Sequence, residues 1–507
     1  MKKNIFANVI GRFWSILSNF LFIPLYIRYL GFESYAIISY SLVIAGLMAI
    51  LDVGLTATLS REFSRIDNSL FEKNRIFRTL ETIYFIIIGL CILCVFCLST
   101  FIAEYGLNLK TVRPEIVSYL IEIISFDIGF QLLLRFYSGG LLGLEKQVKA
   151  NVYQVGWGVL RNGLVVIAII FVPTLEVFFV WQAVSTLIFV IVFRLSLNKE
   201  LTGKYKFDLV LRIEKTVFKK IWRFAGGMLL ISLVAALNTQ MDKMAISTLL
   251  PIESLGYYTL AVSLATGILI VVNPISIALL PRFTALYSSG NTVEASKLYN
   301  KVNLIVAILV FSIMANMAFF AKELIWIWTG NMKLAEQAFV FIPIISFSFA
   351  MLSLATIPYN IAIANGYTKL NYVLGLISLI ITLPSYWFIT KIYGALGAAV
   401  VSCIVQTFIT LIYIYVVNVK FLNGKKVSDL FLKQMLFPLI LAVLVAFGFS
   451  FMPSYVEKSR VIGFVWIGSA TIFTIVISSI LLFSKDEKIK IKNSIFKLKM
   501  KNNAISE

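Results

Sequence analysis

The chain has 507 residues, of which 60% are hydrophobic and only 14% charged, and its formal net charge is +20. A soluble domain could not bury that much apolar surface, whereas apolar stretches of about 20 residues match the thickness of a bilayer core. The sequence contains no histidine, which excludes histidine-based catalysis, metal ligation and proton relay, and we expect neither a metal nor another cofactor.

Fourteen apolar stretches follow one another along the chain, each long enough to cross a bilayer as a helix. We therefore predict an all-α integral membrane protein with about 14 transmembrane helices. The predicted spans are 8–30, 35–60, 80–103, 116–143, 151–172, 175–195, 222–249, 254–280, 301–328, 336–363, 370–390, 394–418, 434–453 and 460–483.

Basic residues are concentrated on one side of these spans. Of the 45 Lys and Arg residues, 33 fall at the two ends and in one alternate set of connections, and 8 fall in the other set. Positive charge near span ends is retained in the cytoplasm, so this bias predicts that both termini are cytoplasmic. We attribute the net charge to orientation and to contact with anionic lipid, and expect no nucleic-acid partner.

Short sequence matches relate the two halves at an offset of about 220 residues. The segment 32–34 matches 252–254, and 149–151 matches 369–371. Six spans is an even number, so both halves enter the membrane from the same side, which predicts a parallel repeat of two six-helix bundles. The predicted domains are an N-terminal bundle at 1–200, a basic cytoplasmic linker at 201–221, a C-terminal bundle at 222–418, two additional spans at 434–483 and a basic cytoplasmic tail at 484–507.

Several charged or amide side chains fall inside predicted spans, where a charge costs at least about 2.5 kcal/mol. Asp127, Gln131 and Arg135 follow one another at intervals of four residues and share one helical face. The neighbouring span carries Arg161, and neither arginine has an obvious partner in the sequence. We predict a hydrated cavity for an anionic cargo, because the planar guanidinium matches phosphate. The candidate cavity residues are Arg135, Arg161, Lys243, Gln131, Arg28 and Arg12.

An alternative interpretation is that these side chains only hold the helices together, for example through an ion pair between Asp127 and Arg135. Acidic residues inside the spans are also candidates for coupling transport to an ion. These candidates are Asp127, Asp52, Asp242 and Glu122. No G-x-x-x-x-G-K-[ST] motif occurs, so we predict a transporter driven by an ion gradient or by the cargo gradient, and not an enzyme.

A resemblance to a known family rests on two segments, RYLGFESY at 28–35 and DVGL at 52–55, the latter running into SRE at 60–62. They are similar to the O-antigen and polysaccharide-unit flippases (Wzx type) of the multidrug/oligosaccharidyl-lipid/polysaccharide exporter superfamily. The resemblance covers the first twelve spans. It implies two six-helix bundles that open alternately to each face, with a cationic interior for which Arg135, Arg161 and Lys243 are the candidates here.

The resemblance also implies a cargo and a location. The cargo would be undecaprenyl-diphosphate-linked oligosaccharide, an O-antigen or related surface polysaccharide unit of the lipopolysaccharide type. It would move from the inner to the outer leaflet of the bacterial cytoplasmic (inner) membrane, with a polysaccharide polymerase as a partner.

Three alternatives stay open. A lipid II flippase would also have fourteen spans and a basic cavity. A multidrug exporter of the same superfamily typically has twelve spans and expels cations, which the arginines and the two extra spans disfavour. An O-antigen polymerase or ligase needs catalytic groups in a sizeable external loop, and the longest external connection here, 104–115, has only a dozen residues.

Overall fold

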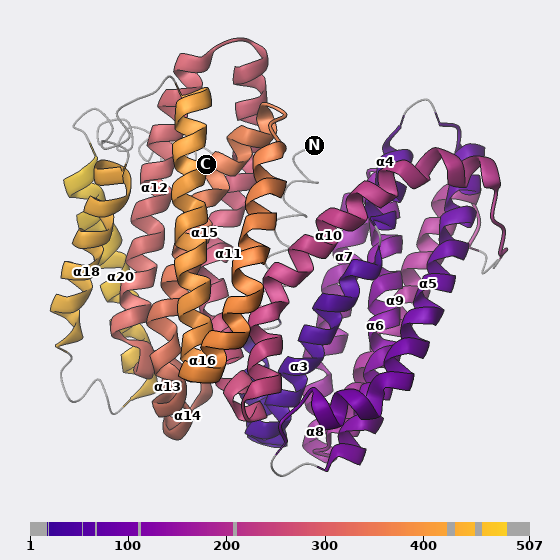
Figure 1. Cartoon of the computed structure of the whole chain (residues 1–507), viewed down its shortest axis with the longest axis horizontal. Coiled ribbons are helices and arrows are strands. Elements are labelled where there is room, and N and C mark those ends of the chain that lie inside the picture. Colours follow the sequence, from indigo (N-terminus) through magenta and orange to yellow (C-terminus); the bar gives the residue numbers. More distant parts are fainter. Residues whose placement is uncertain are drawn as a thin grey trace, which may run out of the picture. The chain divides into compact units, whose positions relative to one another are not determined.

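A computed structural model describes residues 18, 20–52, 54–65, 68–109, 113–205, 210–422, 431–451 and 459–483. The regular elements of these described residues are all helices (Figure 1). Twelve helical segments within them are long and apolar enough to cross a membrane. The predicted all-α membrane fold is thereby confirmed, and most of the first predicted span, 8–30, lies outside the described residues.

Two compact units make up the chain. Unit 1 consists of residues 1–264 and 371–405, and unit 2 of residues 265–370 and 406–507. The long helices α11 (Ile252–Ser288) and α16 (Lys369–Phe421) therefore contribute to both units. The predicted domain boundaries at 200 and 222 stay predictions.

Helix α6 (Pro114–Gly143) is the centre of unit 1 and packs against α4, α5 and α9, with α5, α6 and α9 side by side in Figure 1. Phe136 on α6 stacks on Tyr84 of α5 with ring centroids 4.6 Å apart. The described helices of unit 1, besides α6 and the first parts of α11 and α16, are α2 (Ile23–Leu30), α3 (Phe32–Met48), α4 (Leu55–Ser64), α5 (Leu70–Tyr105), α7 (Gln147–Gly158), α8 (Val165–Phe171), α9 (Leu175–Thr202) and α10 (Lys215–Leu249).

Two glycines let α4 approach α6 closely. A Cβ atom on Gly139 would stand 2.5 Å from the Thr56 side chain, and one on Gly143 would stand 2.5 Å from the Ser60 carbonyl oxygen. Small residues at such crossings are typical of membrane helices, because packing there depends on close backbone contact. The close crossing with α4 therefore fixes the rotation of α6 about its own axis, and with it the orientation of the polar face formed by Asp127, Gln131 and Arg135.

The second predicted span, 35–60, is interrupted in the middle. Helix α3 ends at Met48, a 3₁₀ turn η1 runs over Ala49–Asp52, and α4 begins at Leu55. Gly54 has a φ of 67°, a left-handed conformation that glycine adopts without steric cost. Asp52 accepts a hydrogen bond from the Thr56 backbone at 3.3 Å, so a side chain replaces part of the broken helical ladder.

Helix α12 (Thr292–Phe319) is the centre of unit 2 and packs against α15, α18 and α20. Asn316 of α12 donates to Thr474 of α20 at 3.2 Å, and Arg460 donates to the Ile327 carbonyl oxygen at 2.6 Å. The other described helices here, besides the second parts of α11 and α16, are α13 (Ala321–Thr329), α14 (Met332–Ala338), η3 (Phe339–Phe341), α15 (Ile342–Ala364), η4 (Leu432–Leu436), α18 (Phe437–Ser450) and α20 (Arg460–Leu482). The two additional C-terminal spans are thus part of unit 2.

The 53-residue helix α16 consists of two helices joined at Gly394. Gly394 has φ 65° and ψ −160°, a region of backbone space that is essentially restricted to glycine. The break falls where the sequence predicts the end of the span 370–390 and the start of the span 394–418. One of the twelve long helical segments, α16, therefore contains two of the predicted membrane crossings.

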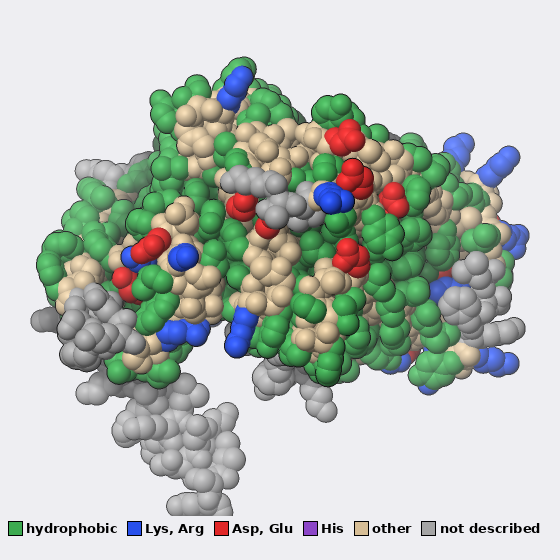
Figure 2. Space-filling model, turned by 90° about the horizontal axis from the view of Figure 1, so that it is seen from below, with side chains coloured by type: hydrophobic (Ala, Val, Ile, Leu, Met, Phe, Trp, Pro, Cys, Tyr) green, Lys and Arg blue, Asp and Glu red, His purple; other side chains and the backbone are tan. Residues whose placement is uncertain are grey.

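The outer surface is mostly apolar. Figure 2 shows hydrophobic side chains over most of one face, with acidic and basic groups few and scattered. Large side chains such as Ile380 and Phe388 are exposed by 71% and 67%, respectively. A water-soluble protein rarely exposes so much contiguous apolar surface, whereas lipid chains accommodate it.

Candidate functional site

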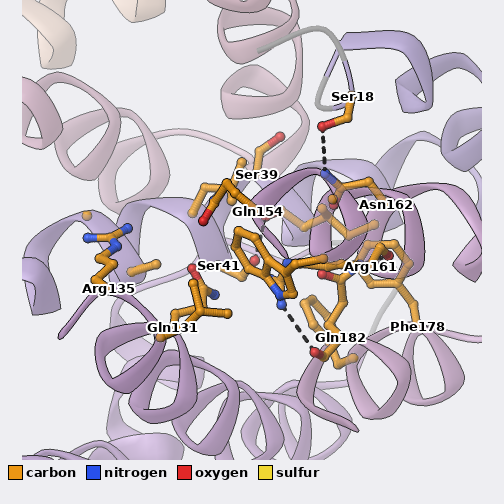
Figure 3. A pocket seen from close by; sticks show the side chains of 18 of the residues that line it. Ser18, Ser39, Ser41, Gln131, Arg135, Gln154, Arg161, Asn162, Phe178 and Gln182 are labelled. Carbon is orange, nitrogen blue, oxygen red and sulfur yellow. Dashed lines mark hydrogen bonds between the residues drawn. The ribbon is translucent and has the colours of Figure 1, made fainter. Parts of the chain in front are cut away.

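A cavity of about 650 Å³ lies inside unit 1 (Figure 3). Its described lining comes from α2, α3, α4, α6, α7, η2 (Val159–Gly163), α9 and α11, together with Ser18. A cavity of this size lies within the range of small-molecule sites. The lining is unusually polar for the interior of a membrane bundle, and it contains two arginines, Arg135 and Arg161.

Arg135 faces this cavity from α6, together with Gln131 one turn earlier and Ser138 one turn later. The Arg135 side chain is exposed, and no carboxylate of the described residues lies within 4.0 Å of its guanidinium. The stripe on α6 therefore places one accessible cation on the cavity wall, within a helix whose length and composition suit a membrane span. An uncompensated cation at such a position requires water, a lipid headgroup or an anionic ligand.

Arg161 lies in the cavity wall but is not free. Its Nη1 and Nη2 atoms donate to the two carboxylate oxygens of Asp127 at 2.6 and 2.8 Å. Nη1 also donates to Thr186 Oγ1 at 2.6 Å, and Arg161 is only 9% exposed. This differs from the sequence-based impression of an unpaired arginine, and from the alternative pairing of Asp127 with Arg135. Bidentate geometry makes the pair strong and removes most of its net charge.

The backbone around Arg161 explains how it reaches Asp127. Helix α7 ends at Gly158, and residues Val159–Gly163 form a single π-helical turn, η2, before α8 begins at Val165. Such turns change the direction of side chains within a helix and are frequent at functional sites. Sequence spacing alone assumes a regular helix, which is why the orientation of Arg161 was not predicted.

Trp157 precedes Arg161 by one turn, and its ring also lines the cavity. The Arg161 guanidinium carbon lies 5.3 Å from the centroid of the Trp157 ring, within the range of a cation–π contact. The indole Nε1 donates to Thr186 Oγ1 at 3.3 Å. The Asp127–Arg161 pair thus also holds an aromatic ring in place.

The remaining predicted cations lie elsewhere. Lys243 on α10 donates to Asp242 at 3.1 Å and to the Thr239 carbonyl oxygen at 2.8 Å, and it is not part of the described cavity lining. Arg28 is exposed at the end of α2, with its guanidinium 5.8 Å from the Tyr29 ring, and is also absent from that lining. Arg12 lies outside the described residues.

Each acidic candidate has hydrogen-bond partners. Asp127 is bound by Arg161 and also accepts from Gln131 Nε2 at 2.9 Å. Asp242 accepts from the Tyr258 hydroxyl at 2.7 Å.

The other two acidic candidates, Asp52 in η1 and Glu122 on α6, accept hydrogen bonds from side chains of α5. Asp52, at the break between α3 and α4, accepts from the Tyr84 hydroxyl at 2.7 Å. Glu122 accepts from Ser99 at 3.3 Å. Their proposed roles in ion coupling stay predictions.

Sequence reasoning missed a second buried ion pair in unit 1. Arg194 of α9 donates from Nε to Glu81 of α5 at 2.8 Å, and the two side chains are only 2% and 1% exposed. The Tyr137 hydroxyl donates to the same Glu81 oxygen at 2.8 Å. Arg194 stands at the end of the predicted span 175–195 and is not among the candidate residues named above. The available signal was an acidic residue, Glu81, in the first turn of the predicted span 80–103, and a basic residue, Arg194, in the last turn of the predicted span 175–195.

Residues from the two predicted repeats meet at the cavity. Thr259 of α11 donates to Ser39 of α3 at 2.9 Å, and these residues are 220 positions apart, the offset of the predicted repeat. Both line the cavity. The predicted parallel repeat itself stays a prediction.

Apolar spanning helices around an internal polar cavity define a multi-pass α-helical membrane protein. The chain belongs to the family described as polysaccharide biosynthesis protein, whose family model matches residues 1–287. It is 22% identical over 376 residues to the "Putative O-antigen transporter" of Shigella flexneri, covering 74% of this chain and 87% of that protein.

Two groups of solved structures share the fold. The lipid II flippase MurJ in an inward closed conformation superposes with a TM-score of 0.69 at 16% identity, covering 95% of this chain and 99% of that one. An inward-facing multidrug resistance transporter of the MATE family and MOP superfamily gives a TM-score of 0.63 at 15% identity, covering 82% and 96%. At these identities the likeness concerns the fold alone.

Proposed function

We propose that this chain is a flippase, not an enzyme, and that it translocates undecaprenyl-diphosphate-linked oligosaccharide from the inner to the outer leaflet of the bacterial cytoplasmic membrane. The oligosaccharide is an O-antigen or a related surface polysaccharide unit. The observation that carries the proposal is the exposed Arg135 in a polar cavity inside a membrane-spanning bundle. Membership of a polysaccharide biosynthesis family supports the same class of cargo.

The physical argument concerns the two ends of such a cargo. Its diphosphate and sugars cannot cross hydrocarbon unaided, because each unsatisfied polar group costs several kcal/mol there. A cavity with an accessible guanidinium replaces water around the phosphate oxygens. Arg161 is neutralised by Asp127, so that among the described lining residues Arg135 is the charged group that an anion would approach. The apolar tail stays against the lipid-compatible outer surface.

Charge distribution supports the orientation. The excess of Lys and Arg in one set of connections favours cytoplasmic termini. Cargo entering from the cytoplasm and leaving on the opposite face fits alternating access. An ion gradient would supply energy, with Asp52, Asp127, Asp242 and Glu122 as the carboxylates to test first. A polysaccharide polymerase acting on the outer face would be the natural partner of such a protein.

Deletion of the gene in its host tests the function. We expect surface polysaccharide to disappear and undecaprenyl-linked single units to accumulate facing the cytoplasm, and a plasmid copy to reverse both effects. Units that reach the outer face unpolymerised would identify a polymerase instead. A loss of viability together with arrested peptidoglycan synthesis would identify a lipid II flippase. Intact polysaccharide with altered drug tolerance would identify a multidrug exporter.

A further inference from the structure

Arg135 and Phe178 lie on opposite sides of the cavity of unit 1 (Figure 3). The side of Phe178, called the aromatic side below, also carries Arg161, which is paired with Asp127. Phe178 and Phe179 line the cavity but are only 3% and 2% exposed, so their rings are almost completely covered. Trp157 is half-buried and is the ring that remains accessible from the cavity. A phosphate would bind near Arg135, which leaves the aromatic side without an assigned ligand.

The Trp157 ring is fixed before any ligand binds. Its Nε1 donates to Thr186, and the Arg161 guanidinium covers the ring at 5.3 Å. Both of these partners are themselves tied to Asp127, at 2.9 Å from Thr186 Oγ1 and 2.6 Å from Arg161 Nη1. A ring held in this way loses little conformational freedom when a ligand stacks on it, so that more of the interaction appears as affinity.

Gln154 lies one helical turn before Trp157 and lines the same cavity. Its amide makes no hydrogen bond with another side chain or backbone group of the described residues, so two N–H donors and a carbonyl oxygen are available. Gln131, on the facing helix α6, uses Nε2 to bind Asp127 and keeps its carbonyl oxygen. The Gln154 amide and the Gln131 carbonyl oxygen can therefore offer directional hydrogen bonds next to a fixed aromatic ring.

This combination matches a sugar ring. A pyranose presents C–H groups on its faces, which suit an aromatic platform, and hydroxyl or acetamido groups around its edge, which suit amide donors and acceptors. Resting on the flippase function proposed above, we propose that Trp157 and Gln154 form a subsite for the sugar directly attached to the diphosphate. Trp157 stacks on the sugar face, Gln154 selects among its edge substituents, and Arg135 binds the phosphate. The protein would thus select its cargo by the first sugar.

Binding of short-chain probes to the purified full-length chain in nanodiscs tests this assignment. The probes are farnesyl diphosphate, which lacks a sugar, and the N-acetylglucosaminyl, glucosyl and galactosyl diphosphoryl farnesols. We expect at least one sugar-bearing probe to bind about tenfold more tightly than farnesyl diphosphate, the scale of one aromatic contact with a hydrogen bond. Trp157→Leu should remove this difference and leave the affinity for farnesyl diphosphate unchanged. Trp157→Phe should retain part of it.

Matched variants separate the subsite from general effects. Gln154→Leu should reduce the differences in affinity among the three sugar-bearing probes. Trp387→Leu, at a tryptophan that is 42% exposed and absent from the cavity lining, should change no affinity. Thermal unfolding of each variant checks that it is folded before binding is compared.

Two patterns would overturn the subsite alone. One is equal affinity of the wild-type chain for all four probes. The other is an unchanged sugar preference in Trp157→Leu, or an equal loss for every probe, as expected if Trp157 contacted the isoprenoid tail. Failure of the flippase function itself looks different. In that case the wild-type chain binds no probe, or Arg135→Ala leaves the affinity for farnesyl diphosphate intact, and the subsite falls with it.

Discussion

Replacement of Arg135 by alanine is expected to reduce translocation by about tenfold to a hundredfold, with no loss of folded protein from the membrane. The reason is that, within the described residues, Arg135 is the accessible cation of the cavity lining and has no carboxylate partner. A charge-assisted hydrogen bond is worth about 1.5–3 kcal/mol, which corresponds to that range of rates or affinities. Export of surface polysaccharide by a complemented deletion strain measures the effect.

Two further variants make the interpretation of Arg135 specific. Arg135→Lys keeps the charge but loses the planar pair of donors, so we expect intermediate activity. Arg113→Ala removes an exposed arginine at the N-terminal cap of the same helix, outside the cavity lining, and should have no effect. Full export by Arg135→Ala at normal protein levels would show that Arg135 does not contact the cargo.

Asp127→Asn should strongly destabilise the protein. The substitution leaves the Arg161 guanidinium 9% exposed and without the carboxylate that now binds both of its Nη atoms. Removing one partner of a buried ion pair typically costs about 3–5 kcal/mol, because the other charge remains buried without compensation. Thermal unfolding in detergent or nanodiscs, together with the amount of monodisperse protein, measures this effect.

The double variant Asp127→Leu/Arg161→Leu provides the control. Both charges are then absent, and the stability should recover most of the loss, since apolar replacements of buried pairs are often close to neutral. Such recovery identifies the pair as a structural element of the bundle. Wild-type stability in both single variants, combined with loss of export in Arg161→Leu alone, would instead place Arg161 in direct contact with the cargo.

The spans could be predicted from the sequence because they depend on local composition. The length of an apolar stretch and the number of basic residues in the connection beside it can be read from each segment alone. The break at Gly394 also coincides with the predicted start of the span 394–418. The 220-residue offset was equally accessible, and Ser39 and Thr259 now meet at that separation. Helical spacing also brought Gln131, Arg135 and Ser138 to one face, which lines the cavity.

The pairing of charges could not be predicted in the same way. Asp127 has one arginine eight residues away in its own helix and another 34 residues away, and only the packing of α7 against α6 and α9 selects Arg161. The π-helical turn at Val159–Gly163 adds a rotation that a regular period does not contain. Likewise, the sequence of α5 does not show which cation pairs with Glu81, because its partner Arg194 comes from α9.

Translocation by the purified chain in proteoliposomes tests the central claim most directly. Vesicles would contain undecaprenyl-diphosphate-linked oligosaccharide with a labelled sugar, initially protected inside from a membrane-impermeant enzyme that removes the label. We predict that the label becomes accessible in vesicles with the wild-type chain, and stays protected in protein-free vesicles and in vesicles with Arg135→Ala. A label that stays equally protected with the wild-type chain, under both a proton and a sodium gradient, would contradict the account.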